Sequence, residues 1–200
     1  MTGSKITFKL DGKDVLASEG ETIWQVAARL GTDIPHLCYK DDANYRADGN
    51  CRACMVEIEG ERVLAASCIR TPSEGMVVSS DNYRATTARK MVMELLVSDQ
   101  PERAVAHDPD SELWKYAREQ NVETGRFPAK LSPEPDSSHP AIAVNMDACI
   151  QCGLCVRACR EVQVNDVIGL AGRGADAHIV FDFGDDMGMS TCVGCGECVQ

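Results

Sequence analysis

Eleven cysteines in short, repeated spacings constrain this chain more than any other feature of its 200 residues. Only 5% of the residues are aromatic, so side-chain packing alone is a poor candidate for holding the whole chain together. The chain starts with an alternating strand pattern and has no apolar leader there. We therefore expect a cytoplasmic protein whose reduced thiols bind metal, and a disulfide framework is the disfavoured alternative.

The strongest pattern is a pair of cysteine triplets in residues 141–200, with one further cysteine between them: Cys149, Cys152, Cys155, Cys159, Cys192, Cys195 and Cys198. Three thiolates spaced by two residues can reach three irons of a [4Fe–4S] cluster, and the fourth cysteine of such a run commonly binds the other cluster of a pair. This rule assigns Cys159 to the cluster of the second triplet. The first triplet then lacks a ligand, which the spacing places at position 202, so we expect a longer polypeptide.

Zinc is the alternative metal for this region, because Cys-x2-Cys pairs also form tetrahedral structural zinc sites. Such sites use pairs, whereas residues 141–200 contain triplets. Gly153, Gly194 and Gly196 let the cysteine loops curl so that N–H groups point at sulfur. A thioredoxin-like redox pair would need one isolated Cys-x2-Cys unit. We therefore predict two [4Fe–4S] clusters here.

A different pattern lies nearer the start of the chain, in the order Cys38-x12-Cys51-x2-Cys54-x13-Cys68. Plant-type [2Fe–2S] domains also combine a close pair of ligands with a preceding cysteine and a distant fourth one, although their first gap is x4. The pattern favours a [2Fe–2S] cluster, and zinc stays open as the alternative. All eleven cysteines are then assigned, so none is left to act as a nucleophile.

Periodicity and composition divide the chain into three segments. Residues 1–80 predict a small α+β domain with one helix on a mixed sheet, and residues 81–140 predict a helical connector that ends in a Pro-rich linker. Residues 141–200 form the domain of the two cysteine triplets. The overall fold class is therefore α+β.

Local signals predict individual elements within these segments. Asp11-Gly12 predicts a type I′ hairpin, and Thr22 with Gln25 forms a capping box at the start of a helix. The connector predicts an inward helical stripe of Ala85, Ala88, Val92, Leu95 and Leu96, capped by Asp81 or Asn82, and a second helix over residues 111–121 with Leu113, Trp114 and Ala117 inward. Strand candidates in the last segment are residues 141–144, 167–168 and 179–183.

Charge and motif content exclude several function classes. The formal net charge of −11 argues against a nucleic-acid partner, because phosphate binding needs clustered Lys and Arg. No apolar stretch approaches the roughly 18–20 residues of a membrane span. No carboxylate pair, triad or activated serine predicts a substrate-converting site. His36 could ligate iron, but a hydrogen-bonding or surface role is favoured because four cysteines already complete that site.

The pattern of Cys38, Cys51, Cys54 and Cys68 resembles the N-terminal [2Fe–2S] domain shared by three kinds of protein. These are the large iron–sulfur subunit of respiratory NADH dehydrogenase, the diaphorase small subunit of NAD-linked hydrogenases, and the α subunit of NAD-dependent formate dehydrogenase. The segment CIQCGLCVRACREVQVNDVIGLAGRG and the ending TCVGCGECVQ look most similar to the formate dehydrogenase α subunit. The resemblance implies a β-grasp [2Fe–2S] domain followed by a ferredoxin-like domain with two [4Fe–4S] clusters.

The same resemblance implies electron transfer within an NAD-dependent formate dehydrogenase. In that family a molybdopterin site with molybdenum or tungsten, outside residues 1–200, oxidises formate. Iron–sulfur clusters then carry electrons to flavin- and NAD-binding partner subunits, and a small iron–sulfur subunit is a further partner. The related hydrogenase and NADH dehydrogenase subunits are the alternatives, and an independent ferredoxin or a redox sensor is the alternative of another class.

One departure from the family pattern bears on these alternatives. Many relatives carry a further [4Fe–4S] site between the two domains, bound by one histidine and three cysteines, but no cysteine lies between Cys68 and Cys149. The missing site weakens the hydrogenase and respiratory assignments more than the formate dehydrogenase one. It also leaves open how electrons cross from one domain to the other.

Overall fold

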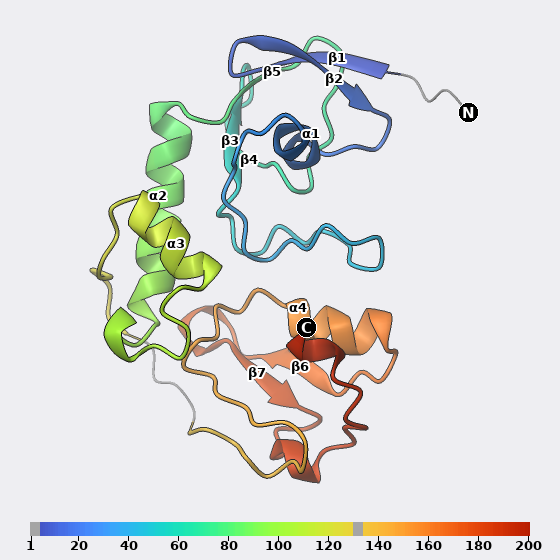
Figure 1. Ribbon diagram of the computed structural model, residues 1–200, viewed down its shortest axis with the longest axis vertical. Coiled ribbons are helices and arrows are strands. Elements are labelled where there is room, and N and C mark those ends of the chain that lie inside the picture. The colour runs from blue at the N-terminus through green and yellow to red at the C-terminus, as the bar shows by residue number, and fades with distance from the viewer. Residues whose placement is uncertain (1–4, 130–133) are drawn as a thin grey trace.

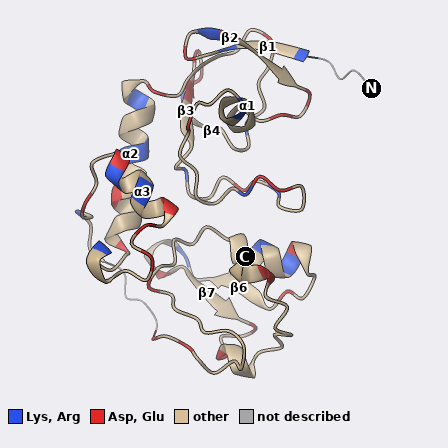
Figure 2. Ribbon diagram, in the orientation of Figure 1, with Lys and Arg blue, Asp and Glu red and all other residues tan. Residues whose placement is uncertain are grey.

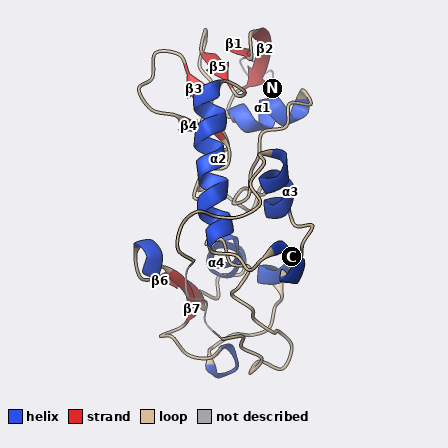
Figure 3. Ribbon diagram, turned by 90° about the vertical axis from the view of Figure 1, so that its left-hand side faces the viewer, coloured by secondary structure: helices blue, strands red, loops and turns tan. Residues whose placement is uncertain are grey.

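Two lobes joined by a helical side piece make up the computed structural model, which describes residues 5–129 and 134–200 (Figure 1). Residues 130–133, part of the predicted Pro-rich linker, lie outside the described residues. The first lobe holds the larger sheet, and the second lobe holds the later cysteines and the C-terminal end. Viewed from the side, the longest helix runs from the strands of the first lobe toward the second lobe (Figure 3).

In the described residues, the first lobe is built on a sheet with strand order β2-β1-β5-β3-β4, whose bounds are β1 Lys5–Leu10, β2 Lys13–Ser18, β3 Met55–Ile58, β4 Ala65–Ala66 and β5 Val77–Ser79. Strands β1 and β2 form the predicted hairpin. Its turn residues Asp11 and Gly12 both have positive φ, 48° and 78°, as a type I′ turn requires. Strand β5 runs parallel to β1 and antiparallel to β3, which confirms the mixed sheet.

Helix α1 (Ile23–Arg29) packs on one face of this sheet, as predicted. The Thr22 hydroxyl accepts a hydrogen bond from the Gln25 backbone N–H at 3.2 Å, and the Gln25 side chain accepts one from the Thr22 N–H at 3.0 Å. Both bonds of the capping box are therefore present. Ile23 and Val26 are fully buried, and burying a side chain of this kind stabilises the fold by about 1.5–3 kcal/mol.

Helices α2 (Tyr83–Ser98) and α3 (Glu112–Glu119) form the side piece. Of the two predicted caps, Asn82 is the one that begins α2, because its side chain accepts a hydrogen bond from the Ala85 N–H at 2.9 Å. The inward faces of both helices share a core with two cysteines of the first lobe: Cys38, Cys51, Ala53, Met93, Val97, Leu113, Trp114, Tyr116, Ala117 and Val122. The inward residues predicted for α3 are therefore confirmed.

The predicted inward stripe of α2 is confirmed at Ala85, which is buried, and at Leu96, which is partly buried against the core shared with α3, but it is wrong at Leu95. The buried residues of this helix recur every four positions, and they are Ala85, Arg89, Met93 and Val97, with Ser98 beyond them. Leu95, which was expected inward, is 48% exposed. A hydrophobicity pattern could not place Arg89 inside, and its guanidinium is held there by a hydrogen bond to the Met55 carbonyl at 3.2 Å.

The second lobe has little regular structure. Its helix α4 (Leu154–Arg157) continues into a π-helical turn over Ala158–Val162, and β6 (Ile168–Ala171) pairs antiparallel with β7 (His178–Phe181). The strand predicted over 141–144 is wrong, because only Val144 pairs there, in an isolated bridge to Asp136. Within the described residues, no helix has the length and apolar character needed to cross a membrane.

Candidate iron–sulfur sites

The four cysteines of the first lobe come from three separate segments and meet in its interior. Cys38 follows the loop after α1, Cys51 and Cys54 lie in the loop before β3, and Cys68 follows β4. None of the four is more than 8% exposed, and all are free thiols. Apolar packing on both sides therefore shields this set from water.

The thiols of this set interact in pairs, and these interactions shift their pKa values. Hydrogen bonds from the thiols of Cys51 and Cys68 lower the pKa of Cys38, and their interaction with Cys38 raises the pKa of each of these two. A hydrogen bond with Cys68 likewise lowers the pKa of Cys54, to about 7. Four thiols linked in this way, two of them with a lowered pKa, are a donor set suited to a metal or cluster that binds thiolates.

The backbone of the ligand loop is bent sharply around this set. Gly49 has φ 63° and Arg52 has φ 58°, both in the left-handed region. The bend directs the Cys51 N–H to the Cys38 sulfur at 3.4 Å. A Cβ at position 49 would meet Ile69 Cδ1 at 3.2 Å, so the glycine also permits close packing.

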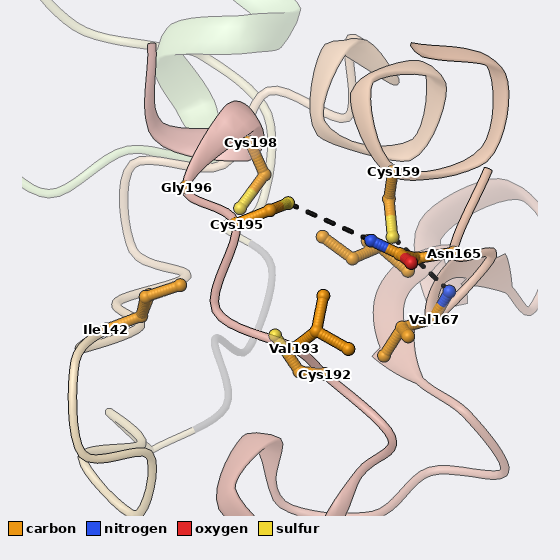
Figure 4. A pocket seen from close by; sticks show the side chains of 10 residues that line it. Ile142, Cys159, Asn165, Val167, Cys192, Val193, Cys195, Gly196 and Cys198 are labelled. Carbon is orange, nitrogen blue, oxygen red and sulfur yellow. Dashed lines mark hydrogen bonds between the residues drawn. The ribbon is translucent and has the colours of Figure 1, made fainter. Parts of the chain in front are cut away.

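The second set surrounds a small cavity in the second lobe. Cys159 and the cysteines of the second triplet line it, together with Ile142, Asn165, Val167, Ile168, Val193 and Gly196 (Figure 4). The Val167 N–H donates to the Cys159 sulfur at 3.3 Å. The Gly194 N–H donates to the Cys192 sulfur at 3.4 Å, as the glycine pattern predicted. Sequence reasoning placed these four cysteines on one cluster, and the structure brings them to one cavity.

The first triplet lies between the two lobes. Cys149 and Cys155 pack against the core of the second lobe, whereas Cys152 packs against the core that contains Cys38 and Cys51. Burial raises the pKa of Cys155 to about 12, and the charges of Cys152 and Cys149 add to this. The triplet thus lies close enough together for its thiols to affect one another electrostatically, and one of its members faces the first lobe.

The donor chemistry of all three sets fits iron–sulfur clusters. Every cysteine is a free thiol, and two sets receive backbone N–H bonds at sulfur. Such bonds stabilise the thiolate ligands of clusters and tune their potentials. Among the residues that the structure describes, no group of three or more His, Cys, Asp and Glu side chains is arranged to hold a single metal ion.

Sequence reasoning missed the residues that fasten the two lobes together. The Asn50 side chain donates to the Cys152 carbonyl at 3.2 Å, and the Tyr45 hydroxyl donates to Glu197 at 2.8 Å. Arg157, in the short gap between two predicted ligands, is buried and reaches back to the first lobe. The one available signal was the charge of Arg157 in residues 154–159, where every other residue is apolar or a cysteine.

His36 makes contacts typical of a packed side chain. Its ring lies 4.4 Å from the Trp24 ring between centroids, and its Nδ1 is 3.5 Å from the Tyr116 hydroxyl. These contacts agree with the hydrogen-bonding role that was favoured from sequence.

Comparisons with known families define the class of protein. Residues 3–83 match the family described as a 2Fe-2S iron-sulfur cluster binding domain, and residues 145–200 match the family described as a 4Fe-4S dicluster domain. The chain is therefore an iron–sulfur protein that combines these two domain types. The predicted fold class, a [2Fe–2S] ferredoxin domain followed by a two-[4Fe–4S] domain, is confirmed.

Individual relatives narrow this class. The chain is 34% identical over 203 residues to the NADP-reducing hydrogenase subunit HndD of Solidesulfovibrio fructosivorans, covering 98% of this chain and 34% of that protein. It is 36% identical over 173 residues to a subunit of the NADH-quinone oxidoreductase of Rickettsia prowazekii, covering 85% of this chain and 25% of that protein. The crystal structure of an NAD+-reducing [NiFe]-hydrogenase in the H2-reduced state matches with a TM-score of 0.79 at 27% identity, covering 94% of this chain and 80% of that chain.

These matches place the chain in the iron–sulfur region of the family that unites these NADH-quinone oxidoreductase and NAD(P)-reducing hydrogenase subunits. The chain spans about a quarter to a third of the length of the two curated relatives.

Proposed function

We propose that this chain is the iron–sulfur electron relay of an NAD-linked oxidoreductase complex of the hydrogenase or NADH dehydrogenase type. The observation that carries the proposal is the meeting of the two lobes at cysteines: Cys152 of the second lobe packs in the same core as Cys38 and Cys51 of the first. Three separate thiol sets that follow one another through the fold are suited to carrying single electrons over a distance.

The proposed ligand assignments follow the three sets. Cys38, Cys51, Cys54 and Cys68 hold a [2Fe–2S] cluster; Cys159, Cys192, Cys195 and Cys198 hold one [4Fe–4S] cluster; and Cys149, Cys152 and Cys155 provide three ligands of a second [4Fe–4S] cluster. When bound, these clusters supply one-electron redox chemistry. The thiolates bind the irons, the apolar cores exclude water, and N–H groups at sulfur tune the potentials.

A direct route from the first lobe to the second follows from this arrangement. The sequence lacks cysteines for an additional cluster between Cys68 and Cys149. The Cys152 thiol lies close enough to Cys38 for the Cys38 charge to raise its pKa, alongside the larger effect of burial. The contact between these two ligand loops supports electron transfer between them with no cluster in between.

The test is metal and sulfide analysis of anaerobically reconstituted protein, combined with low-temperature EPR after reduction. We expect about ten irons if all three clusters assemble, or about nine if the first triplet forms a three-iron cluster. We also expect EPR signals of both [2Fe–2S] and [4Fe–4S] types. Zinc in place of iron, or colourless protein without sulfide, would reject the proposal.

Formate dehydrogenase is the second candidate for the parent complex. It is favoured by the resemblance of residues 149–174 and by the missing intermediate site, and it implies a molybdopterin site outside residues 1–200. With either candidate, the partners we propose are flavin- and NAD-binding subunits and a small iron–sulfur subunit, and the location that we propose from the start of the sequence is the cytoplasm. Reduction of the clusters in the natively purified complex by formate, but not by hydrogen, would identify the formate dehydrogenase. Reduction by hydrogen, or by NAD(P)H with no reduction by formate, would identify the other class.

A further inference from the structure

Arg157 is the most deeply buried charged side chain at the contact between the lobes. It ends helix α4, two residues after Cys155 and two before Cys159, and its side chain is only 3% exposed. Because an unpaired buried charge is strongly disfavoured, the contacts of this guanidinium must compensate for its desolvation. Because Arg157 lies between the proposed ligands Cys155 and Cys159 on one short helical segment, its contacts also affect the position of the clusters.

Almost all hydrogen-bond and ion-pair partners of the Arg157 guanidinium lie in the first lobe. Nη2 donates to the carbonyl oxygen of Cys38 at 2.6 Å, and Nη1 donates to the carbonyl oxygen of Arg46. Nε forms an ion pair with Asp48 Oδ2 at 3.2 Å and also lies 3.4 Å from the carbonyl oxygen of Gly153 in its own lobe. The N–H groups of the guanidinium thus connect the backbone of Cys38, a proposed [2Fe–2S] ligand, to the segment that carries the first triplet.

The charges around Arg157 are arranged in layers. Asp48 is its partly buried partner, with 16% of the side chain exposed. Farther out, the exposed Arg46 side chain bridges Asp48 and Glu161, with 2.8 Å from its Nη2 to Glu161 Oε1. In Figure 2, basic residues lie on α4 and the turn after it, opposite a loop of the first lobe that carries acidic residues. Water screens the outer pair, so Arg157 and Asp48 are the less screened charges at this contact.

The effect of these charges on the reduction of a nearby cluster has a definite sign. Reduction of a cluster adds one negative charge, so a nearby cation favours the reduced form and a nearby anion favours the oxidised form.

We propose that Arg157 is a positioning residue for electron transfer: it holds the Cys38 loop against the loop of the first triplet, and its buried charge favours reduction of the cluster on Cys38. Asp48 orients the guanidinium and acts on that reduction with the opposite sign. This inference rests on the proposed function, since it requires a redox cluster on the first thiol set.

The experiment is an EPR-monitored redox titration of the [2Fe–2S] signal in the reconstituted 200-residue chain. Three variants are compared with the wild type: Arg157→Gln, Asp48→Asn and, as the matched control, Arg160→Gln. Arg160 lies on the same helical segment, but it is 54% exposed and pairs with Asp166, away from the first lobe. The [2Fe–2S] set is the one to follow, because Arg157 donates to the backbone of its proposed ligand Cys38 and all four of its proposed ligands lie within this chain.

At the potential where the wild-type cluster is half reduced, we expect Arg157→Gln to lower the ratio of reduced to oxidised cluster by about tenfold, which is about 59 mV for a one-electron couple. Asp48→Asn should raise the ratio, and Arg160→Gln should leave it within about twofold of the wild type. Opposite shifts for the two partners of one ion pair would not arise if the pair only held the lobes together, because loosening the contact would move both variants in the same direction.

Unchanged potentials in both Arg157→Gln and Asp48→Asn, or shifts of the same sign, would overturn the inference while leaving the proposed function intact. If Arg157→Gln does not assemble its clusters, the sign of the Asp48→Asn shift decides alone. Failure of the wild-type chain to bind a [2Fe–2S] cluster would instead reject the proposed function. The two failures are therefore distinguishable.

Discussion

At the scale of single residues, each proposed ligand belongs to one thiol set and should affect that set alone. Cys54 is fully buried beside Cys68, and Cys195 is an exposed member of the cavity in the second lobe. Within the described residues, Cys54 and Cys68 lie in the core of the first lobe, whereas Cys159, Cys192 and Cys198 lie in or against the core of the second, so we expect a substitution in one set to leave the other site intact.

A reciprocal pair of substitutions tests this independence. Cys54→Ser should abolish the EPR signal of the [2Fe–2S] cluster and leave the [4Fe–4S] signals, because a serine hydroxyl is a much poorer ligand for iron than a thiolate. Cys195→Ser should abolish the signal of the [4Fe–4S] cluster proposed on Cys159, Cys192, Cys195 and Cys198, and leave the [2Fe–2S] signal. Iron content and EPR of the two variants, reconstituted in parallel, measure the effect, and each variant is the control for the other. Loss of all clusters in either one would contradict the ligand assignment.

The raised pKa of Cys155 gives a prediction on pH. With a pKa of about 12, caused mainly by burial, this thiol keeps its proton throughout the neutral range when no metal is bound. Iron must displace that proton, so binding through Cys155 should weaken about tenfold for each unit by which the pH falls. We expect a competing chelator to remove iron from the first triplet faster at about pH 6 than at about pH 8. Iron release that is independent of pH would contradict this.

At the scale of elements, the loop after α3 holds the end of helix α2 in place. Arg126 pairs with Glu94 at 2.7 Å, and the Phe127 N–H donates to the Ser98 hydroxyl at 3.3 Å. Gly125 lies directly against Ser98, where a Cβ would overlap both its side chain and its backbone. The absence of a side chain at position 125 is therefore a packing requirement and has no connection with a turn.

Gly125→Ala should destabilise the connector for this reason. Because the overlap involves backbone, we expect a loss of about 1–3 kcal/mol in the free energy of unfolding. Gly169→Ala is the matched control, since the nearest atom to its new Cβ is Val180 Cγ2 at 3.6 Å, an ordinary contact. Chemical denaturation of the two reconstituted variants provides the comparison, and equal stability of both would show that the approach at Ser98 is not tight.

At the scale of the whole molecule, the two lobes differ in how much apolar core they have. Among the described residues, the core of the first lobe contains fifteen buried residues, whereas that of the second contains six, one of which is Cys159. A core this small and poor in aromatic residues stabilises a fold only weakly, so bound metal must contribute much of the folding free energy of the second lobe.

Removal of iron should therefore unfold the second lobe first. After anaerobic chelation, we expect hydrogen exchange to accelerate strongly in residues 141–200, while strands β1 and β2 and helix α1 keep most of their protection. Peptide-level hydrogen exchange of the holo and apo forms measures this directly, with the first lobe as internal reference. Full protection of residues 141–200 in the apo protein would show that side-chain packing alone is sufficient there.

The sequence by itself determined the features that depend on neighbouring residues. Spacing along one loop predicted the two cysteine triplets, the hairpin turn at Asp11-Gly12 and the capping box at Thr22, because each is settled within a few residues. Only the tertiary structure decided which side of α2 is buried, since Arg89 lies inside through a bond to a distant carbonyl. It also decided that Arg157 and Cys152 meet the first lobe, because a contact across more than one hundred residues depends on how the lobes pack and leaves no trace in local spacing.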